Sequence, residues 1–169
     1  KSFETIEEFY YSLAMIAEVG LCTSTTLERV HQLISKTNQF NLTTRRHSLN
    51  TIHNWIESSH SIVALLRLRD KFGDMGIVAV AIVLQRENND IWEIDTFLMS
   101  CRIMGRRVEN AFINYIIGEV QSRGAKQLFA KYYRTERNHI VSDFYSTLGF
   151  EHVSEDTDDA NLFLLRPDK

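Results

Sequence analysis

The 169-residue chain has few features that would cross-link it through disulfides or metal ions or fix it in a membrane. Its two cysteines, Cys22 and Cys101, form no CxxC pair, so we exclude a disulfide framework and expect a reducing, cytoplasmic setting. Its longest apolar run, Ile77 to Leu84, is far shorter than the about 20 residues that a membrane helix needs. No HExxH motif, cysteine–histidine cluster or carboxylate array indicates a metal site, and we expect none.

The chain also has no large excess of charge of one sign. The chain has 19 basic and 22 acidic residues, a net charge of −3 with histidine neutral. This balance argues against a nucleic-acid-binding surface and against a polybasic membrane anchor, so we expect neither partner. With 44% hydrophobic and 24% charged residues, the composition is that of a globular protein. Residues 1–169 therefore predict a single domain with a sizeable core.

The first third of the chain is predicted to be mostly helical. Apolar residues recur at helix spacing in 3–17, in 27–34 and again in 52–56. A polar segment, 37–46, separates the second and third of these patterns and is a poor helix, because Asn and Thr side chains compete for the backbone. We expect residues 1–58 to form a helical annex. Because a helical pattern starts almost at once, we also expect a longer protein.

Residues 59–169 change character and predict a core of sheet and helix. A helix is expected over 107–123, ended by Gly124, and another over 136–148, stopped at Gly149. Short β-branched or alternating runs bounded by turns predict the strands. These lie at 61–69, 77–85, 91–100, 127–133, 150–153 and 162–165. The first three are expected to form an antiparallel meander.

The turn between the strand ending at Ser100 and the helix from 107 carries the first chemical signal. A glycine at 105 lets the backbone bend with positive φ, and the amides that begin a helix can bind an anion. The turn resembles the pyrophosphate loop of GNAT acyltransferases, with Arg102 and Gly105 matching the family pattern. Arg107 stands where the family has Gly or Ala, and it either crowds the loop or adds positive charge. The alternative is an ordinary tight turn without a ligand.

A second pattern lies near the C-terminus. Asn138, followed by Phe144-Tyr145 and then Leu148-Gly149-Phe150, resembles the last helix of the GNAT fold. The resemblance implies that Asn138 lies near a pantetheine arm and that Tyr145 protonates a departing thiolate. The alternative for Tyr145 is a half-buried core phenol whose hydroxyl has a hydrogen-bond partner.

Together the two patterns imply a GNAT-like fold of the α/β (α+β) class. It would have a mixed, mostly antiparallel sheet that splays after its central strand, helices on both faces, and the N-terminal annex.

A narrower resemblance covers nearly the whole chain. The segments 36–46, 70–74 and 94–102 are similar to the C-terminal half of FkbH-like proteins. This resemblance implies an upstream HAD-type phosphatase domain, which would carry the only Mg²⁺, because the HAD signature is absent from this chain. It also implies a function. The domain would load a three-carbon, glyceryl-type acyl group, derived from 1,3-bisphosphoglycerate, onto the phosphopantetheine thiol of an acyl carrier protein in polyketide biosynthesis.

Transfer of the acyl group needs a thiol that accepts it and a site that binds the donor. Cys101 is the candidate nucleophile, because it precedes a helix start and adjoins Arg102. The alternative is that Cys101 only fills space at the strand end as a small apolar side chain, and that the carrier thiol attacks the acyl donor directly. The polar segment supplies the residues expected to bind the acyl donor: Asn38, Asn41, Thr44, Arg45 and Arg46. The alternative is that Asn38 and Asn41 tie the loop to the sheet and that the two arginines are solvated.

Two other functions stay open at this point. One is a generic GNAT N-acyltransferase that uses acyl-CoA, and the other is a non-catalytic module that docks a carrier protein. In each case we expect no tightly bound cofactor, with phosphopantetheine or CoA acting as a co-substrate.

Overall fold

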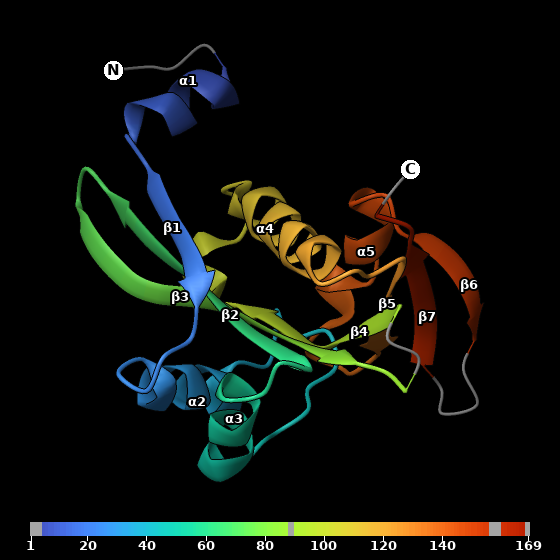
Figure 1. The fold of residues 1–169 in the computed structure, drawn as a ribbon. Coiled ribbons are helices and arrows are strands. Elements are labelled where there is room, and N and C mark those ends of the chain that lie inside the picture. The colour runs from blue at the N-terminus through green and yellow to red at the C-terminus, as the bar shows by residue number, and fades with distance from the viewer. Residues whose placement is uncertain (1–4, 88–89, 156–159, 168–169) are drawn as a thin grey trace.

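A single seven-stranded sheet forms the centre of the protein, as seen in a computed structural model that describes residues 5–87, 90–155 and 160–167. The strand order is β1-β2-β3-β4-β5-β7-β6 (Figure 1). The strands are β1 (Ile16–Leu21), β2 (Ser61–Asp70), β3 (Gly73–Gln85), β4 (Ile91–Met99), β5 (Gln127–Tyr133), β6 (Glu151–Glu155) and β7 (Ala160–Leu165). Neighbours are antiparallel except β4 and β5, which run parallel. The predicted mixed, mostly antiparallel sheet is confirmed.

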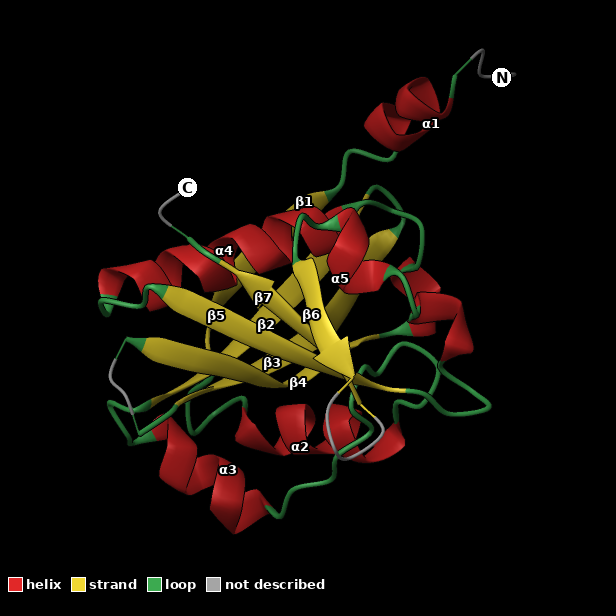
Figure 2. Ribbon diagram, turned by 90° about the vertical axis from the view of Figure 1, so that its right-hand side faces the viewer, coloured by secondary structure: helices red, strands yellow, loops and turns green. Residues whose placement is uncertain are grey.

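Helices cover both faces of this sheet, as predicted. They are α1 (Ile6–Ser12), α2 (Leu27–Lys36), α3 (Leu49–Ile56), α4 (Val108–Ser122) and α5 (Phe144–Thr147), with short 3-10 turns η1 (Cys101–Ile103) and η2 (His139–Val141). Figure 2 shows α4 and α5 on one face and α2 and α3 on the other. Within the described ranges, no helix is long and apolar enough to cross a membrane.

The core follows from the apolar pattern of the central strands. Strand β3 is buried without a break from Ile77 to Val83, because one of its faces packs toward α4 and the other toward α2. Helix α4 buries one apolar stripe, which includes Phe112 and Ile116, against the sheet. The chain leaves this helix through Gly124, whose φ of +83° is the left-handed conformation that ends many helices.

Two segments differ from the predicted elements. Ile16 and Ala17 continue a helical pattern in the sequence but lie in strand β1, which pairs antiparallel with β2. The helix before them ends when Ala14 adopts a φ of +50°, so the apolar spacing of 3–17 spans two elements. The helix expected over 136–148 is broken into η2 and α5, because the Asn138 side chain bonds its local backbone instead of leaving it to a helix.

The sheet opens between β4 and β5, as predicted. These strands pair only from Ile91 to Ile94, opposite Gln127 to Ala130. Asp95 is the extra residue of a β-bulge, since Val83 pairs with Ile94 and Ile82 with Thr96. A bulge bends its strand, and here it marks the point where β4 leaves β5.

The protein's own chain fills the opening. The backbone N–H of Leu42 donates to the carbonyl of Phe97 (3.1 Å), and the Met99 N–H donates to the carbonyl of Phe40 (3.0 Å). On the other side, the Tyr133 N–H donates to the carbonyl of Leu42 (2.9 Å). Residues 40–42 therefore bridge β4 and β5 like a short inserted strand.

Candidate active site at the end of strand β4

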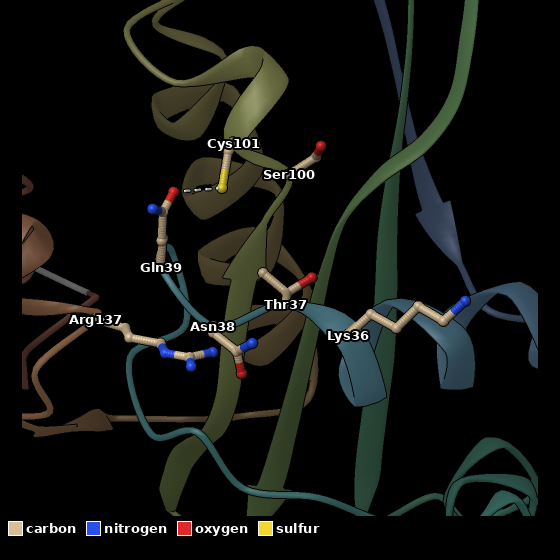
Figure 3. Close-up of a pocket in the computed structure, with 7 residues that line it drawn as sticks. All are labelled: Lys36, Thr37, Asn38, Gln39, Ser100, Cys101 and Arg137. Carbon is tan, nitrogen blue, oxygen red and sulfur yellow. Dashed lines mark hydrogen bonds between the residues drawn. The ribbon is translucent and has the colours of Figure 1, made fainter.

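A pocket of about 530 Å³ lies beside the end of β4. The end of α2 and the loop after it form one side, and the residues that follow β4 form the other (Figure 3). The lining residues are Lys36, Thr37, Asn38, Gln39, Ser100, Cys101 and Arg137. The structure thus brings the predicted nucleophile and one predicted donor-binding residue, Asn38, to the same pocket.

The two cysteines have opposite surroundings. Cys101 is exposed, and its Sγ donates a hydrogen bond to Oε1 of Gln39 (3.0 Å), as Figure 3 shows. Cys22 is 5% exposed, and burial raises the pKa of its thiol, although a hydrogen bond from Thr26 opposes that effect. A reagent or substrate in solution therefore meets the Cys101 thiol and not that of Cys22.

The charge of the pocket suits an anionic ligand. Lys36 and Arg137 lie on its two sides, and none of the described residues that line it is a carboxylate. Figure 3 shows Arg137 reaching toward Asn38, while Lys36 extends along the other side of Thr37. Two cations and no carboxylate among these lining residues favour phosphate or carboxylate ligands at this point of the surface.

The turn from Arg102 to Arg107 forms as a tight connection between η1 and α4. Gly105 has a φ of +75°, and its carbonyl accepts a hydrogen bond from the Tyr10 hydroxyl. Arg107 is the N-cap of α4 and adopts a φ of +60°, which costs a residue with a side chain about 1 kcal/mol. No side chain caps this helix start, and Arg102 and Arg107 are exposed beside it. The predicted anion-binding role of the turn stays a prediction.

Two of the predicted donor-binding residues shape the loop instead of facing a pocket. Asn41 is fully buried; its amide donates to the Thr37 carbonyl (3.1 Å), and its Oδ1 accepts from the Thr44 N–H (2.9 Å). The Arg46 guanidinium donates to the carbonyls of Ile34 and Thr37, which close the C-terminal end of α2. The Asn41 side chain thus bonds within its own loop, and the Arg46 side chain bonds to the end of α2, so Arg46 is not the solvated side chain of the alternative.

Arg45 belongs to a cluster around the bulged Asp95. Its guanidinium pairs with the Asp95 carboxylate, which also lies 2.7 Å from Nε2 of His47 and accepts from the Thr96 hydroxyl (2.8 Å). Arg45 further donates to the Tyr133 hydroxyl (3.4 Å). Burial raises the pKa of Asp95, but the bonds from His47, Thr96 and Arg45 outweigh it and hold that pKa below its ordinary value. Asp95 is therefore a buried anion with its partners in place.

Asn138 is also committed within the protein. It is fully buried, and its amide nitrogen donates to the carbonyls of Asn41 (2.8 Å) and Tyr133 (2.9 Å). Its Oδ1 accepts from the Thr135 N–H (2.7 Å). The residue expected near a pantetheine arm thus holds the inserted segment 40–42 in place.

Tyr145 does not line the pocket. It is 1% exposed and packs against the rings of Phe144, Phe150 and Phe163. Its hydroxyl has no hydrogen-bond partner among the described residues, and burial strongly raises its pKa. Tyr145 therefore packs in the core, as in the alternative, but it is fully buried instead of half-buried, and its hydroxyl is not satisfied among the described residues.

Sequence reasoning missed four residues that the structure places at these sites: Gln39, His47, Asp95 and Arg137. Asp95 carried a usable signal, because an acidic residue inside an otherwise apolar strand needs a partner. The other three come from loops, where no periodicity indicates which way a side chain points.

Among the described residues, no group of three His, Cys, Asp or Glu side chains could hold a metal ion.

No family model matches the sequence, and no curated protein matches it. Solved structures match the fold. The ribosomal-protein-S18-alanine N-acetyltransferase from Escherichia coli superposes with a TM-score of 0.64 at 14% identity, covering 89% of this chain and 94% of that one. The GNAT domain of S. lividans PAT gives a TM-score of 0.69 at 15% identity, over 92% of this chain and 97% of that one.

N-acetylglutamate synthase from Neisseria gonorrhoeae, complexed with coenzyme A and N-acetyl-glutamate, gives a TM-score of 0.69 at 15% identity. The match covers 91% of this chain and 36% of that one. The strand order, the parallel β4–β5 pair and these superpositions together show that this chain has the GNAT acetyltransferase fold.

Proposed function

We propose that this domain is an acyltransferase that passes a three-carbon, glyceryl-type acyl group through Cys101 to the phosphopantetheine thiol of an acyl carrier protein. One observation carries the proposal: an exposed thiol stands in an electropositive pocket at the end of β4. The donor that suits such a pocket is an acyl phosphate derived from 1,3-bisphosphoglycerate, since Lys36 and Arg137 attract its phosphate groups.

The reaction has two steps. In the first, the Cys101 thiol attacks the acyl carbon, a C–S bond forms, and the C–O bond to phosphate breaks. The departing phosphate takes up the thiol proton. In the second, the carrier thiol attacks the thioester, the acyl group moves to the carrier sulfur, and the proton of the carrier thiol returns to Cys101. Gln39 orients the sulfur in the resting state through its 3.0 Å hydrogen bond.

The inserted segment 40–42 argues against acyl-CoA bound in the splay between β4 and β5. Backbone groups of Phe97, Met99 and Tyr133 at the splay are already bonded to this segment, and Asn138 is bonded to it as well. A pantetheine chain could enter the splay only after these bonds break. An acyl phosphate that binds at the surface pocket needs no such opening.

A generic N-acyltransferase that uses acyl-CoA is the second candidate. It is favoured by the shared fold with N-acetylglutamate synthase, which was solved in complex with coenzyme A. The buried Asp95 and its His47 partner would then be the groups to examine as a proton acceptor for an amine.

The remaining parts of the proposed reaction lie outside this chain. An upstream HAD-type domain with Mg²⁺ would remove the second phosphate, and the product would enter polyketide assembly in the cytoplasm. A domain that only docks a carrier protein would show neither acylation nor CoA-dependent turnover.

Intact-protein mass spectrometry tests the proposal. The chain is incubated with 1,3-bisphosphoglycerate and then with a holo acyl carrier protein. We expect a phosphoglyceryl thioester on Cys101, followed by its transfer to the carrier. Turnover of an amine with acetyl-CoA, without any Cys101 adduct, would support the generic enzyme instead.

A further inference from the structure

A second pocket continues the first one. It has a volume of about 330 Å³ and is lined by Asn38, Thr44, Thr135, Glu136 and Arg137. Asn38 and Arg137 also line the Cys101 pocket, so the two pockets are neighbours on either side of this pair of side chains. The two pockets together are called here the outer groove; their lining runs from Cys101 over the loop after α2 to the turn after β5.

We propose that the outer groove holds the phosphopantetheine arm of the acceptor, with its thiol at Cys101. The proposal rests on the proposed function in that an arm-borne thiol is the acyl acceptor. The lining chemistry supports it: hydroxyl, carboxamide and carboxylate groups flank the second pocket, and a pantetheine chain carries two amide groups and a hydroxyl that pair with such side chains.

Asn38 is well placed to bind the arm. Its Oδ1 accepts a hydrogen bond from Arg46 (2.6 Å), which fixes the side chain at the junction of the two pockets. The amide nitrogen is then the group of Asn38 that a ligand carbonyl would meet. Glu136 is exposed on the far side of the junction and offers its carboxylate to a ligand N–H.

The competing path for the arm, through the splay between β4 and β5, is filled. Leu42 is fully buried there, and the ring of Phe40 packs against those of Phe97 and Phe144. Opening that path would expose these apolar side chains and break the backbone bonds on both strands. The outer groove requires no such change.

The length of a thiol ligand determines how much of the outer groove it occupies. A short thiol needs only the pocket at Cys101, whereas a full pantetheine arm also crosses the second pocket. A bulky side chain in the second pocket should therefore act against the long arm and leave the short thiol unaffected.

Thiol–disulfide exchange measures this without any acyl transfer. Cys101 thiolate attacks pantethine, the disulfide of pantetheine; one S–S bond breaks, a mixed disulfide forms on Cys101, and one pantetheine thiolate leaves. The comparison reagent is the disulfide of N-acetylcysteamine, and intact mass follows both rates. We expect pantethine to react about tenfold faster than the short reagent, the gain from roughly one good hydrogen bond. Cys101→Ala serves as the blank.

The deciding variant is Glu136→Trp, which fills the second pocket from an exposed position. Its matched control is Arg134→Trp, an exposed residue of the same turn that lines neither pocket. We expect the preference for pantethine to disappear in Glu136→Trp and to persist in Arg134→Trp. No preference in the wild type, or an unchanged preference in Glu136→Trp, would overturn the groove. A preserved preference in a protein that forms no acyl adduct would refute the proposed function and leave the groove standing.

Discussion

Strand β4 carries two polar sites that differ in how completely their groups are satisfied. In the middle of the strand, Asp95 is 5% exposed and is bonded to Arg45, His47 and Thr96. Just after its end, Cys101 is exposed and its thiol has one hydrogen bond to a described residue, Gln39, in a pocket whose cations face solvent. The first arrangement is that of a structural hub, and the second leaves capacity for a ligand.

Cys101→Ala should abolish transfer. Without the sulfur no thioester forms, and loading of the carrier protein should fall to the uncatalysed background, while stability changes by only about 1 kcal/mol. The measurement is intact mass of both proteins, with urea unfolding as the check on folding. Cys22→Ala is the matched control, and it should still be acylated at Cys101. Persistent loading by Cys101→Ala would show that the carrier thiol attacks the donor directly.

Asp95→Asn should damage stability. Removing the charge leaves Arg45 and His47 without their anion, which we expect to lower the free energy of unfolding by about 2–3 kcal/mol. The exposed pair of Asp74 and Arg67 offers a control, since Asp74→Asn should change stability little. Denaturant unfolding of both variants makes the comparison. Equal losses of stability in the two variants would show that the buried Asp95 contributes no more to stability than an exposed carboxylate.

The same carboxylate predicts a pH dependence. Because the pKa of Asp95 is lowered on folding, its stabilising effect is complete above the unfolded pKa of about 3.9 and is lost as pH falls toward the folded value. Asp70, whose pKa the Arg106 hydrogen bond lowers, acts in the same direction. The loss of stability between about pH 5 and 3 should be smaller in Asp95→Asn than in the wild type. An equal loss of stability in the two proteins over this pH range would contradict the pairing of the Asp95 carboxylate with Arg45 and His47.

Arg137→Ala should weaken donor binding at the other site. Loss of one charge-assisted hydrogen bond raises the donor concentration for half-maximal Cys101 acylation about tenfold. Arg134→Ala removes the same charge from a neighbouring exposed position and should have a much smaller effect. Arg45→Ala should leave donor affinity unchanged, because that guanidinium is bound to Asp95. A strong loss of donor affinity in Arg45→Ala would show instead that the polar segment 37–46 binds the phosphate of the donor.

Tyr145→Phe separates catalysis from packing. A proton donor would cost a factor of about 10²–10⁴ in rate when removed. We expect instead an unchanged rate and a gain of about 1 kcal/mol in stability, because the buried hydroxyl has no partner among the described residues. Steady-state loading rates and thermal unfolding distinguish the two outcomes.

The sequence predicted the fold well because its strongest patterns are periodic. The buried run of β3, the stripe of α4 and the glycine after it all reappear in the structure. It failed where one apolar spacing served two elements, as at Ile16, and where a side chain competed with helix backbone, as at Asn138.

The site was harder to predict for a physical reason. Residue type alone does not show whether a polar group is already satisfied. Asn41, Arg46 and Asn138 have the chemistry of ligand-binding residues, but the protein uses that chemistry internally. Asn38, from the same loop as Asn41 and Arg46, lines the pocket together with Cys101. The difference depends on loop geometry, which local sequence does not encode.

The central claim is that Cys101 carries the acyl group, and one measurement tests it most directly. The wild-type chain is mixed with 1,3-bisphosphoglycerate alone, quenched in acid, and digested for peptide mass mapping. The account predicts a hydroxylamine-sensitive phosphoglyceryl adduct on the peptide that contains Cys101 and none on the peptide that contains Cys22. An unmodified Cys101 under conditions in which a holo carrier protein becomes loaded would contradict it.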